Sequence, residues 1–290
     1  MNYRHAFHAG NFADVLKHAV LARILVLLAR KDTPFRVLDT HAGIGLYDLS
    51  SAEAVKTGEW RDGIGRILAA PFPAPVAALL EPWLTAVASA AGYTRPEHLA
   101  PGRLARYPGS PLIVRAGLRR DDRATVVELH PSDAKTLAEL FAGDARVKVM
   151  ELDGWLALKS ALPFKERRGL VLIDPPFEKE GEFDRIVTGL VRATARFAGG
   201  CYLVWHPIKD RRELARHHAA LVETGLRRIM TVELAVSEIR PDRPLSACGL
   251  TIVNPPWKLD VELDLLLPAL AERLALGPGA GASWRWLVPE

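Results

Sequence analysis

From residue 111 onward the sequence alternates short apolar runs with segments of helical periodicity. The apolar runs are rich in β-branched residues and cover 124–129, 147–152, 170–174 and 201–205. The helical segments cover 111–120, 131–141, 154–162, 181–198 and 209–224. A helix at 12–29, capped by Asn11, and a strand at 35–39 precede them. Because strands joined through helices pair in parallel, the pattern predicts an α/β protein with a doubly wound, Rossmann-like sheet.

Two parts of the chain depart from this alternation. The strand-like runs 227–236 and 247–254 follow each other without a helix between them, so we expect a late antiparallel hairpin. Residues 50–108 are rich in Ala and Pro, with helical patches and no clear strand. We therefore expect a helical insertion at 50–108, between residues 1–49, which begin the sheet domain, and residues 109–290, which complete it.

Composition narrows the class of protein. A chain of 290 residues with 49% hydrophobic and 25% charged residues is typical of a soluble globular protein. No unbroken run of about 18 apolar residues predicts a membrane span, and the polar N-terminus does not resemble a secretion signal, so the cytoplasm is the expected location. Cys201 and Cys248 lie in apolar segments without metal or redox spacing and are expected to be buried thiols. The net charge of +4 permits nucleic-acid binding without requiring it.

Four acidic residues follow the ends of successive strands in the expected parallel part of the sheet. They are Asp39, Glu128, Asp153 and Asp174. The carboxyl ends of parallel strands meet at one edge, where doubly wound sheets bind their ligands. Helix capping would explain one or two of these acids, but a shared ligand explains all four better. We therefore expect the functional site at this edge.

The first of these strands leads into DTHAGIG, residues 39–45, which is shorter than a dinucleotide-binding fingerprint. Its Gly43 permits close approach of the backbone to a ligand. Glu128 can accept hydrogen bonds from both hydroxyls of a ribose, yet no cradle for a pyrophosphate is evident. A nucleoside cofactor without phosphates fits this pattern, which favours S-adenosylmethionine. Asp153 could then bind the adenine amino group, and Gly154 would leave room for the ring.

The segment LVLIDPPFEK, residues 170–179, ends its strand in an acid, two prolines and an aromatic ring. This order suits methylation of an amino group conjugated to a ring or a carbonyl, whose delocalised lone pair is poorly nucleophilic. The Asp174 carboxylate and the Pro175 carbonyl can accept its N–H bonds and turn the lone pair toward the methyl group. Consecutive prolines hold these acceptors rigidly, and Phe177 can stack on the base. We expect Asp174, Pro175 and Phe177 to be catalytic.

A second copy of this pattern, NPPW, begins at Asn254. An amide oxygen could accept the same hydrogen bonds. Its strand, however, belongs to the expected antiparallel hairpin, whereas Asp174 ends a strand beside the central one. We therefore interpret Asn254, Pro255 and Trp257 as a turn and a helix start, with the Trp257 ring packed in the fold.

Several motifs together resemble one known family, the bacterial 23S ribosomal RNA adenine-N6 methyltransferases of the J type. They are YRHAFHAGNFADVLKH, LDTHAGIG, YPGSPLI, ELHPSD, RRGLVLIDPPFE, NPPWKL and VPE. They span almost the whole chain and are specific in combination. The resemblance implies a class I S-adenosylmethionine-dependent methyltransferase fold with a small helical insertion. It also implies a monomer that methylates 23S rRNA, either protein-free or in an early assembly intermediate.

The resemblance also implies roles for particular residues. Those that would contact the cofactor are His18, His41, Gly43, Ser110, Glu128, Asp153, Gly154 and Asp174. Asp174 matches the catalytic acid. Tyr3 matches a position that engages RNA, with His5 and Lys17 nearby in the same motif. The family often has Tyr where this chain has Phe177, so stacking is retained but a phenolic role cannot be carried over.

Other interpretations of these motifs remain open from the residues alone. The conjugated-nitrogen chemistry is shared by enzymes that methylate DNA bases, RNA adenine or the side-chain amide of a protein glutamine. If the target is a nucleobase, it must be unpaired or flipped out of its helix. A non-catalytic RNA-binding protein on the same fold is a further alternative. His5, His8 and His18 lack a diagnostic ligand spacing, so we expect no metal site.

Overall fold

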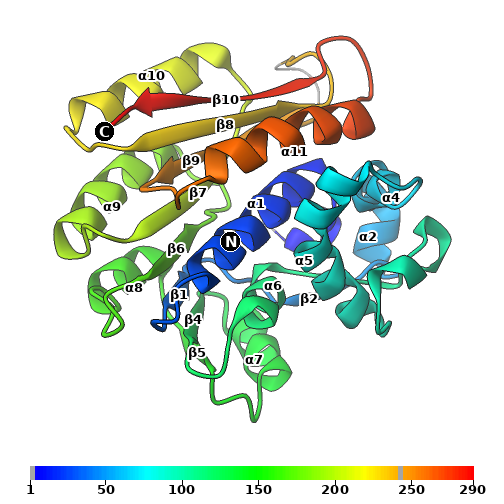
Figure 1. Cartoon of the computed structure of the whole chain (residues 1–290), viewed down its shortest axis with the longest axis horizontal. Helices are drawn as coiled ribbons and strands as arrows, with labels where there is room; N and C mark the ends of the chain where they lie inside the picture. The colour runs from blue at the N-terminus through cyan, green and yellow to red at the C-terminus, as the bar shows by residue number, and fades with distance from the viewer. Residues whose placement is uncertain (1–3, 241–243) are drawn as a thin grey trace.

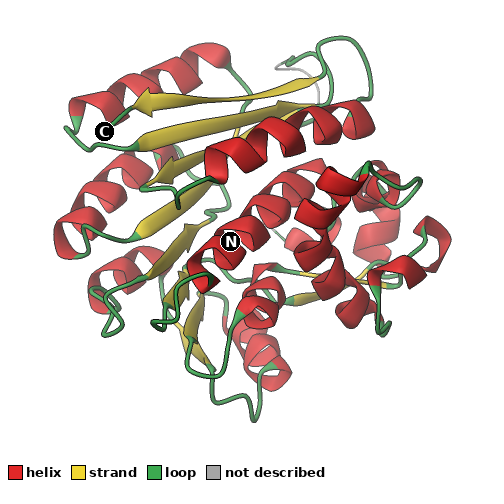
Figure 2. Cartoon of the chain, viewed as in Figure 1, coloured by secondary structure: helices red, strands yellow, loops and turns green. Residues whose placement is uncertain are grey.

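The structure is a computed structural model and describes residues 4–240 and 244–290. Its centre is an eight-stranded sheet with the order β5-β4-β1-β6-β7-β9-β8-β10 (Figures 1 and 2). The strands are β1 Arg36–Asp39, β4 Arg123–Glu128, β5 Val147–Glu151, β6 Gly169–Ile173, β7 Cys201–Pro207, β8 Ile229–Ala235, β9 Ala247–Val253 and β10 Gly281–Val288.

The directions of the strands confirm the expected class I methyltransferase fold. β1 pairs in parallel with β4 and β6, and these pair in parallel with β5 and β7. β9 is antiparallel to both β7 and β8, which confirms the late hairpin. β10, which pairs antiparallel with β8 at the edge of the sheet, was not expected. Because β6 neighbours β1, Asp174 lies at the centre of the sheet's ligand-binding edge.

Helices cover both faces of the sheet (Figure 1). One face carries α1 Phe12–Ala29, α6 Ser110–Gly117, α7 Pro131–Leu140 and α11 Leu259–Leu274. The opposite face carries α8 Gly154–Ser160, α9 Glu182–Arg196 and α10 Arg211–Glu223. Asn11 caps α1 as expected, because its side chain accepts hydrogen bonds from the backbone N–H groups of Ala13 and Asp14. α1 contacts α5, α6 and α11 and is buried on most sides, so its few polar residues lie inside the molecule.

The expected insertion begins and ends at a small antiparallel sheet. β2 Leu46–Asp48 pairs with β3 Arg106–Pro108, a strand that the sequence did not predict. Between them lie α2 Ala52–Thr57, α3 Glu59–Asp62, α4 Ile64–Ile67, α5 Ala74–Ala91 and the short 3-10 turns η2 Pro96–His98 and η3 Pro101–Arg103. Residues 50–108 stay a proposed insertion, with β3 as its last segment and β2 just before it.

Among the described helices, α5 has the length and composition that would allow it to cross a membrane. The sequence did not predict such a segment. A third of its apolar window is buried, and Leu80, Trp83 and Val87 belong to the core that α1 and α11 share. Packing against these helices therefore accounts for an apolar face on α5.

The apolar core lies in layers on the two faces of the sheet. Cys201 and Cys248 are free and buried in it, as expected. Burial raises the pKa of the Cys248 thiol to about 12, so this thiol is protonated at neutral pH. Neither cysteine belongs to the cavity described next.

Candidate active site

A cavity of about 1610 Å³ lies at the carboxyl ends of the central strands, where segments that follow β1, β4, β5, β6 and β7 meet α1. The described residues expected to bind cofactor or RNA or to be catalytic line it: His5, Lys17, His18, His41, Gly43, Ser110, Glu128, Asp153, Gly154, Asp174, Pro175 and Phe177. Asp39, the remaining strand-end acid, does not line it. Tyr3 lies outside the described residues. The fold thus brings together side chains that are up to about 170 residues apart in the sequence.

The four strand-end acids meet at this edge, but in different surroundings. β1 ends at Asp39, which is fully buried and accepts a hydrogen bond from the Ser110 hydroxyl at 2.6 Å. Burial raises the pKa of Asp39 to about 7, although the Ser110 bond opposes the shift. Ser110, expected to contact a cofactor, therefore also fixes Asp39 behind the cavity wall.

Glu128 joins two loops at the cavity wall. It accepts hydrogen bonds from the His130 backbone N–H at 2.8 Å and from the Gly43 N–H at 2.9 Å. Gly43 has a φ of +60°, and a Cβ there would lie 2.2 Å from the Tyr47 hydroxyl oxygen, so only glycine fits. Because a carboxylate has about four lone-pair positions, Glu128 retains acceptor capacity for the hydroxyls of a ligand.

Asp153 and Gly154, which the sequence assigned to cofactor binding, each have a structural role as well. Asp153 Oδ1 caps α8 by accepting hydrogen bonds from the Trp155 and Leu156 N–H groups at 2.8 and 3.1 Å. A Cβ at Gly154 would lie 2.3 Å from the Thr40 carbonyl oxygen, so the glycine is required by packing of the chain against itself. Among the described residues, nothing bonds to Asp153 Oδ2, which remains available to a ligand.

Two histidines line the cavity in their neutral form, of which His18 is buried and His41 is partly exposed. His18 is 1% exposed, and its Nδ1 lies 2.8 Å from the Tyr107 hydroxyl. Its Nε2 is buried without a hydrogen-bond partner among the described residues. Burial lowers the pKa of His18 to about 3 and that of His41 to about 4. Both rings can therefore donate and accept hydrogen bonds at neutral pH.

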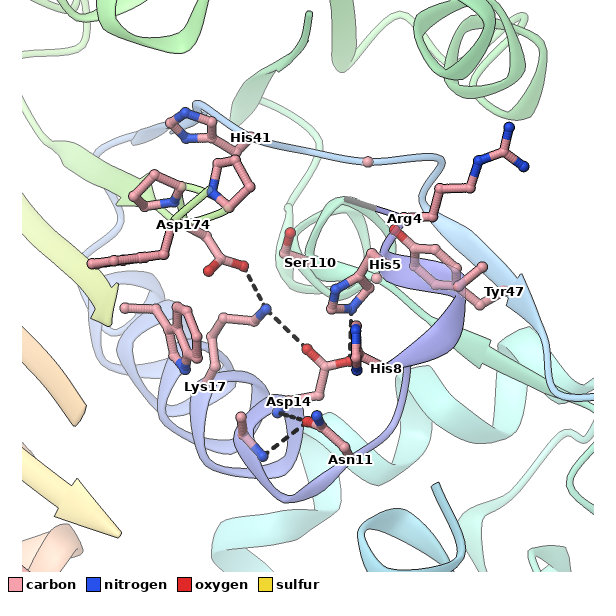
Figure 3. Close-up of a pocket in the computed structure, with 18 of the residues that line it drawn as sticks. Arg4, His5, His8, Asn11, Asp14, Lys17, His41, Tyr47, Ser110 and Asp174 are labelled. Atoms are coloured by element: carbon pink, nitrogen blue, oxygen red, sulfur yellow. Dashed lines mark hydrogen bonds and ion pairs between the residues drawn. The ribbon is translucent and has the colours of Figure 1, made fainter. Parts of the chain in front are cut away.

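Asp174 is held by an ion pair that the sequence did not predict (Figure 3). Lys17 Nζ lies 2.5 Å from Asp174 Oδ2 and 2.9 Å from Asp14 Oδ1. Burial would lower the pKa of Lys17, but the two carboxylates raise it well above its usual value, so Lys17 remains an ammonium. His5 Nε2 lies 3.0 Å from Asp14 Oδ2. The sequence does contain a signal that could have identified Asp14: it is an acid three residues before Lys17 in a mostly apolar helix.

Phe177 is half-buried between two other rings. Its centroid lies 5.1 Å from that of Phe183 and 6.0 Å from that of Trp205, both in edge-on geometry. Its φ is +50°, a left-handed conformation that is rare for a bulky side chain. Trp205 also lines the cavity but was not nominated, because an aromatic residue near the end of a buried strand is an ordinary core pattern.

The second copy, NPPW, follows β9 and therefore lies at the opposite edge of the sheet. Its Asn254 side chain donates to the Ala198 and Gly200 carbonyls at 2.8 and 3.0 Å, and α11 begins shortly afterwards, as expected. The Trp257 ring is 78% exposed, with Lys258 Nζ 4.4 Å from its centroid. The expectation that Trp257 packs inside the fold is therefore wrong, because the ring lies in the turn before α11 and is open to solvent.

The three N-terminal histidines have separate partners. His5 contacts Asp14, His8 contacts Glu59, and His18 contacts Tyr107. Within residues 4–240 and 244–290, no three His, Cys, Asp or Glu side chains converge as a metal site would require.

Comparison with known proteins matches residues 32–288 to the family described as Ribosomal RNA large subunit methyltransferase D, RlmJ. The chain belongs to this family. It is 42% identical over 291 residues to Ribosomal RNA large subunit methyltransferase J of Escherichia coli (strain K12). It is 41% identical over 293 residues to the Haemophilus influenzae protein of the same name. Both alignments cover 100% of each chain.

A crystal structure of a protein from Legionella pneumophila str. Philadelphia 1 has a similar fold throughout. Its TM-score with this chain is 0.82 at 31% identity, and the alignment covers 96% of this chain and 97% of the other. The two chains therefore share the fold over nearly their whole lengths.

Proposed function

We propose that this protein transfers a methyl group from S-adenosylmethionine to N6 of an adenine in 23S rRNA. The base would be unpaired or flipped out of its helix. Membership of the RlmJ family supports methyl transfer to ribosomal RNA. An amino nitrogen is proposed as the methyl acceptor because of one observation. Asp174, Pro175 and Phe177 lie on the wall of the same cavity that the nominated cofactor residues line.

The residues present fit the cofactor. Glu128 would hold the ribose hydroxyls, and Asp153 Oδ2 would accept from the adenine amino group. His18 lines the same cavity with His41 and Ser110, and its buried Nε2, which has no partner among the described residues, would fit a polar group of the methionine portion. When bound, S-adenosylmethionine supplies an electrophilic methyl group.

Asp174 and Pro175 would prepare the target nitrogen. The Asp174 carboxylate and the Pro175 carbonyl accept the two N–H bonds of the amino group, which turns its lone pair toward the methyl donor. Pro175 and Pro176 fix these acceptors before the substrate binds. Phe177 would stack on the base and so offset part of the cost of unstacking it. The proton that N6 releases would leave through the Asp174 carboxylate.

The proposed partner is 23S rRNA, protein-free or in an early assembly intermediate, and the proposed location is the bacterial cytoplasm. The proposed active state is a monomer, as the resemblance to the J-type enzymes implies. His5 and Lys17 line the cavity at its N-terminal wall, which suits contact with the RNA near the target base.

The test is a methyl-transfer assay that offers protein-free ribosomal RNA, assembled large subunits and DNA in parallel. Nucleoside mass spectrometry should find N6-methyladenosine in the 23S rRNA. Methylation of DNA alone would support the DNA alternative. Cofactor binding without turnover on any substrate would support the non-catalytic one.

The matched control for this assay is Asp174→Ala. It should reduce turnover by a factor on the order of a hundred or more, as expected for loss of a preorganised polar group. S-adenosylmethionine binding, measured by calorimetry, should remain nearly unchanged. Activity within a few-fold of the unmodified protein would contradict the catalytic role of Asp174.

A further inference from the structure

Asp14 lies at the centre of the contacts that join the N-terminal segment to Asp174 (Figure 3). Its side chain is 2% exposed. Its Oδ2 lies 3.0 Å from His5 Nε2 and accepts a hydrogen bond from the Gly10 N–H at 2.9 Å. Its Oδ1 lies 2.9 Å from Lys17 Nζ, which in turn reaches Asp174 Oδ2 at 2.5 Å. One buried ammonium is thus within hydrogen-bond distance of two carboxylates.

This arrangement weakens the acceptor that the chemistry proposed for Asp174 needs. Lys17 donates to Oδ2, and although the carboxylate keeps lone pairs for the target amino group, the ammonium attracts negative charge away from them. In addition, methyl transfer places positive charge on the nitrogen, and a fixed ammonium nearby would oppose it. Movement of the ammonium away from Asp174 removes both effects as the target nitrogen takes its place.

We infer that Asp14 is a positioning residue, an inference that rests on the proposed function. Asp14 pairs with the Lys17 ammonium when the target amino group binds to Asp174. In the empty site Lys17 holds the Asp174 carboxylate in place. When the substrate binds, Lys17 shifts fully to Asp14 by a small change of side-chain torsions, since both residues lie on α1 three positions apart. The ammonium then remains paired throughout, which a buried charge requires.

Asp14 has the charge that this role needs. Burial would raise its pKa, but His5 and the Lys17 ammonium, with His18 beside them, lower it well below its usual value, so it is a carboxylate at neutral pH. The ionisable groups within 4 Å of it come from η1 His5–Phe7 and α1, and the turn between them adds the Gly10 N–H. His18 Nε2 is farther away, at 3.7 Å.

A purely structural role for Asp14 is the alternative, because it also anchors the Gly10 turn at the start of α1. Asp14→Asn separates the two roles. The amide oxygen can still accept from the Gly10 N–H, but the negative charge that draws the ammonium away from Asp174 is removed.

The experiment is a double-mutant cycle with Asp14→Asn and Lys17→Met, read out as the single-turnover rate of rRNA methylation at saturating cofactor and RNA. In the presence of Lys17, Asp14→Asn should slow methylation roughly ten- to hundredfold, because the ammonium stays on Asp174. Cofactor affinity by calorimetry should change less than about threefold. In the Lys17→Met background, the same substitution should change the rate less than about threefold, because no ammonium needs to be moved.

Equal slowing in both backgrounds would overturn the inference in favour of structural anchoring, and so would an unchanged rate for Asp14→Asn alone. These results differ from failure of the proposed function, in which the unmodified protein itself does not methylate rRNA. Asp14→Glu retains the charge and should recover most of the rate that Asp14→Asn loses.

A measurement on the unmodified protein applies even if Asp14→Asn does not fold. Nitrogen-15 NMR can follow the Lys17 Nζ signal, assigned by its loss in Lys17→Met. Adding adenosine and S-adenosylhomocysteine, at concentrations where calorimetry shows both bound, should shift this signal as the ammonium leaves Asp174. An unchanged signal under those conditions would contradict the transfer to Asp14.

Discussion

Phe177 shows how a functional side chain can be held in an unfavourable conformation by its neighbours. A φ of +50° costs a bulky residue on the order of 1 to 3 kcal/mol and persists only when surrounding contacts impose it. The rings of Phe183 and Trp205 supply those contacts. Phe177 therefore contributes to packing as well as to the proposed stacking on the base.

We predict that Phe177→Ala reduces methylation by an amount equivalent to roughly 1 to 3 kcal/mol, because the stacking surface for the base is lost. It should also lower the melting temperature by a few degrees, since the ring is half-buried. Phe177→Tyr keeps the ring and serves as the control. Normal single-turnover methylation by the Ala variant would rule out stacking on Phe177.

A second prediction compares the same substitution at Trp257 and at Trp83, because one side chain is exposed and the other is buried. Trp257 is 78% exposed, whereas Trp83 is completely buried in α5. Trp257→Ala should change the free energy of unfolding by less than about 1 kcal/mol, as surface substitutions usually do. Trp83→Ala should cost about 3 to 5 kcal/mol. Thermal melts of the two variants provide the comparison, and a large loss for Trp257→Ala would mean that its ring is covered in solution.

At the scale of elements, α1 depends on a local cap and on burial together. Asn11 Oδ1 accepts from two backbone N–H groups at 3.0 Å, and its side-chain amide donates to Glu59 Oε2 at 2.9 Å. The cap stops the chain from continuing as helix into the Gly10 turn, and α1 then carries Asp14 and Lys17 into the cavity on successive turns. The local cap therefore fixes where α1 begins, and with it the side of the helix on which Asp14 and Lys17 lie.

Asn11→Ala should lower the free energy of unfolding by about 1 to 2 kcal/mol, because it removes the cap and the hydrogen bond to Glu59. Asn11→Ser keeps an oxygen acceptor at the cap and should lose less. Urea denaturation of the two variants measures the difference. If both lose the same amount, the bond to Glu59 rather than the cap accounts for the stability of this end of α1.

At the scale of the whole molecule, buried histidines make stability depend on pH. Burial lowers the pKa of His18, His206 and His217 to about 3 and that of His41 to about 4, below the value near 6.5 that holds in the unfolded chain. Between these values the unfolded chain binds more protons, so stability falls as pH falls. Asp39, whose pKa rises to about 7, acts in the opposite direction between about pH 4 and 7. Four histidines outweigh this single acid.

We therefore predict that the free energy of unfolding decreases as the pH drops from 6.5 toward 4. His217 is the most direct probe, because neither of its ring nitrogens has a hydrogen-bond partner among the described residues and its ring packs against Phe183 at 4.6 Å. His217→Phe should reduce the loss of stability between pH 7 and pH 5 by about 1 to 2 kcal/mol. Urea denaturation at the two pH values tests this. An identical pH dependence in the variant would show that His217 is protonated in the folded protein.

Local sequence patterns were enough to predict the parallel sheet, the late hairpin and the edge at which the acids meet. These follow from local patterns: β-branched runs alternate with helical periods, and an acid follows each of four strands. The choice of DPPF over NPPW also followed from the directions of their strands, since one lies at the carboxyl edge beside β1 and the other lies at the opposite edge. Such features are readable because each is encoded within one element and its connection to the next.

Which surfaces cover one another could be seen only in the folded chain. Periodicity marks an apolar or charged side chain but not its partner, so the exposure of Trp257, the pairing of β10 with β8 and the rings around Phe177 were not predictable. The contact of Lys17 with Asp174 joins positions 157 residues apart. Its physical cause is burial: a charge at the inner surface of α1 must find an opposite charge, and only the folded chain shows which carboxylates lie within reach.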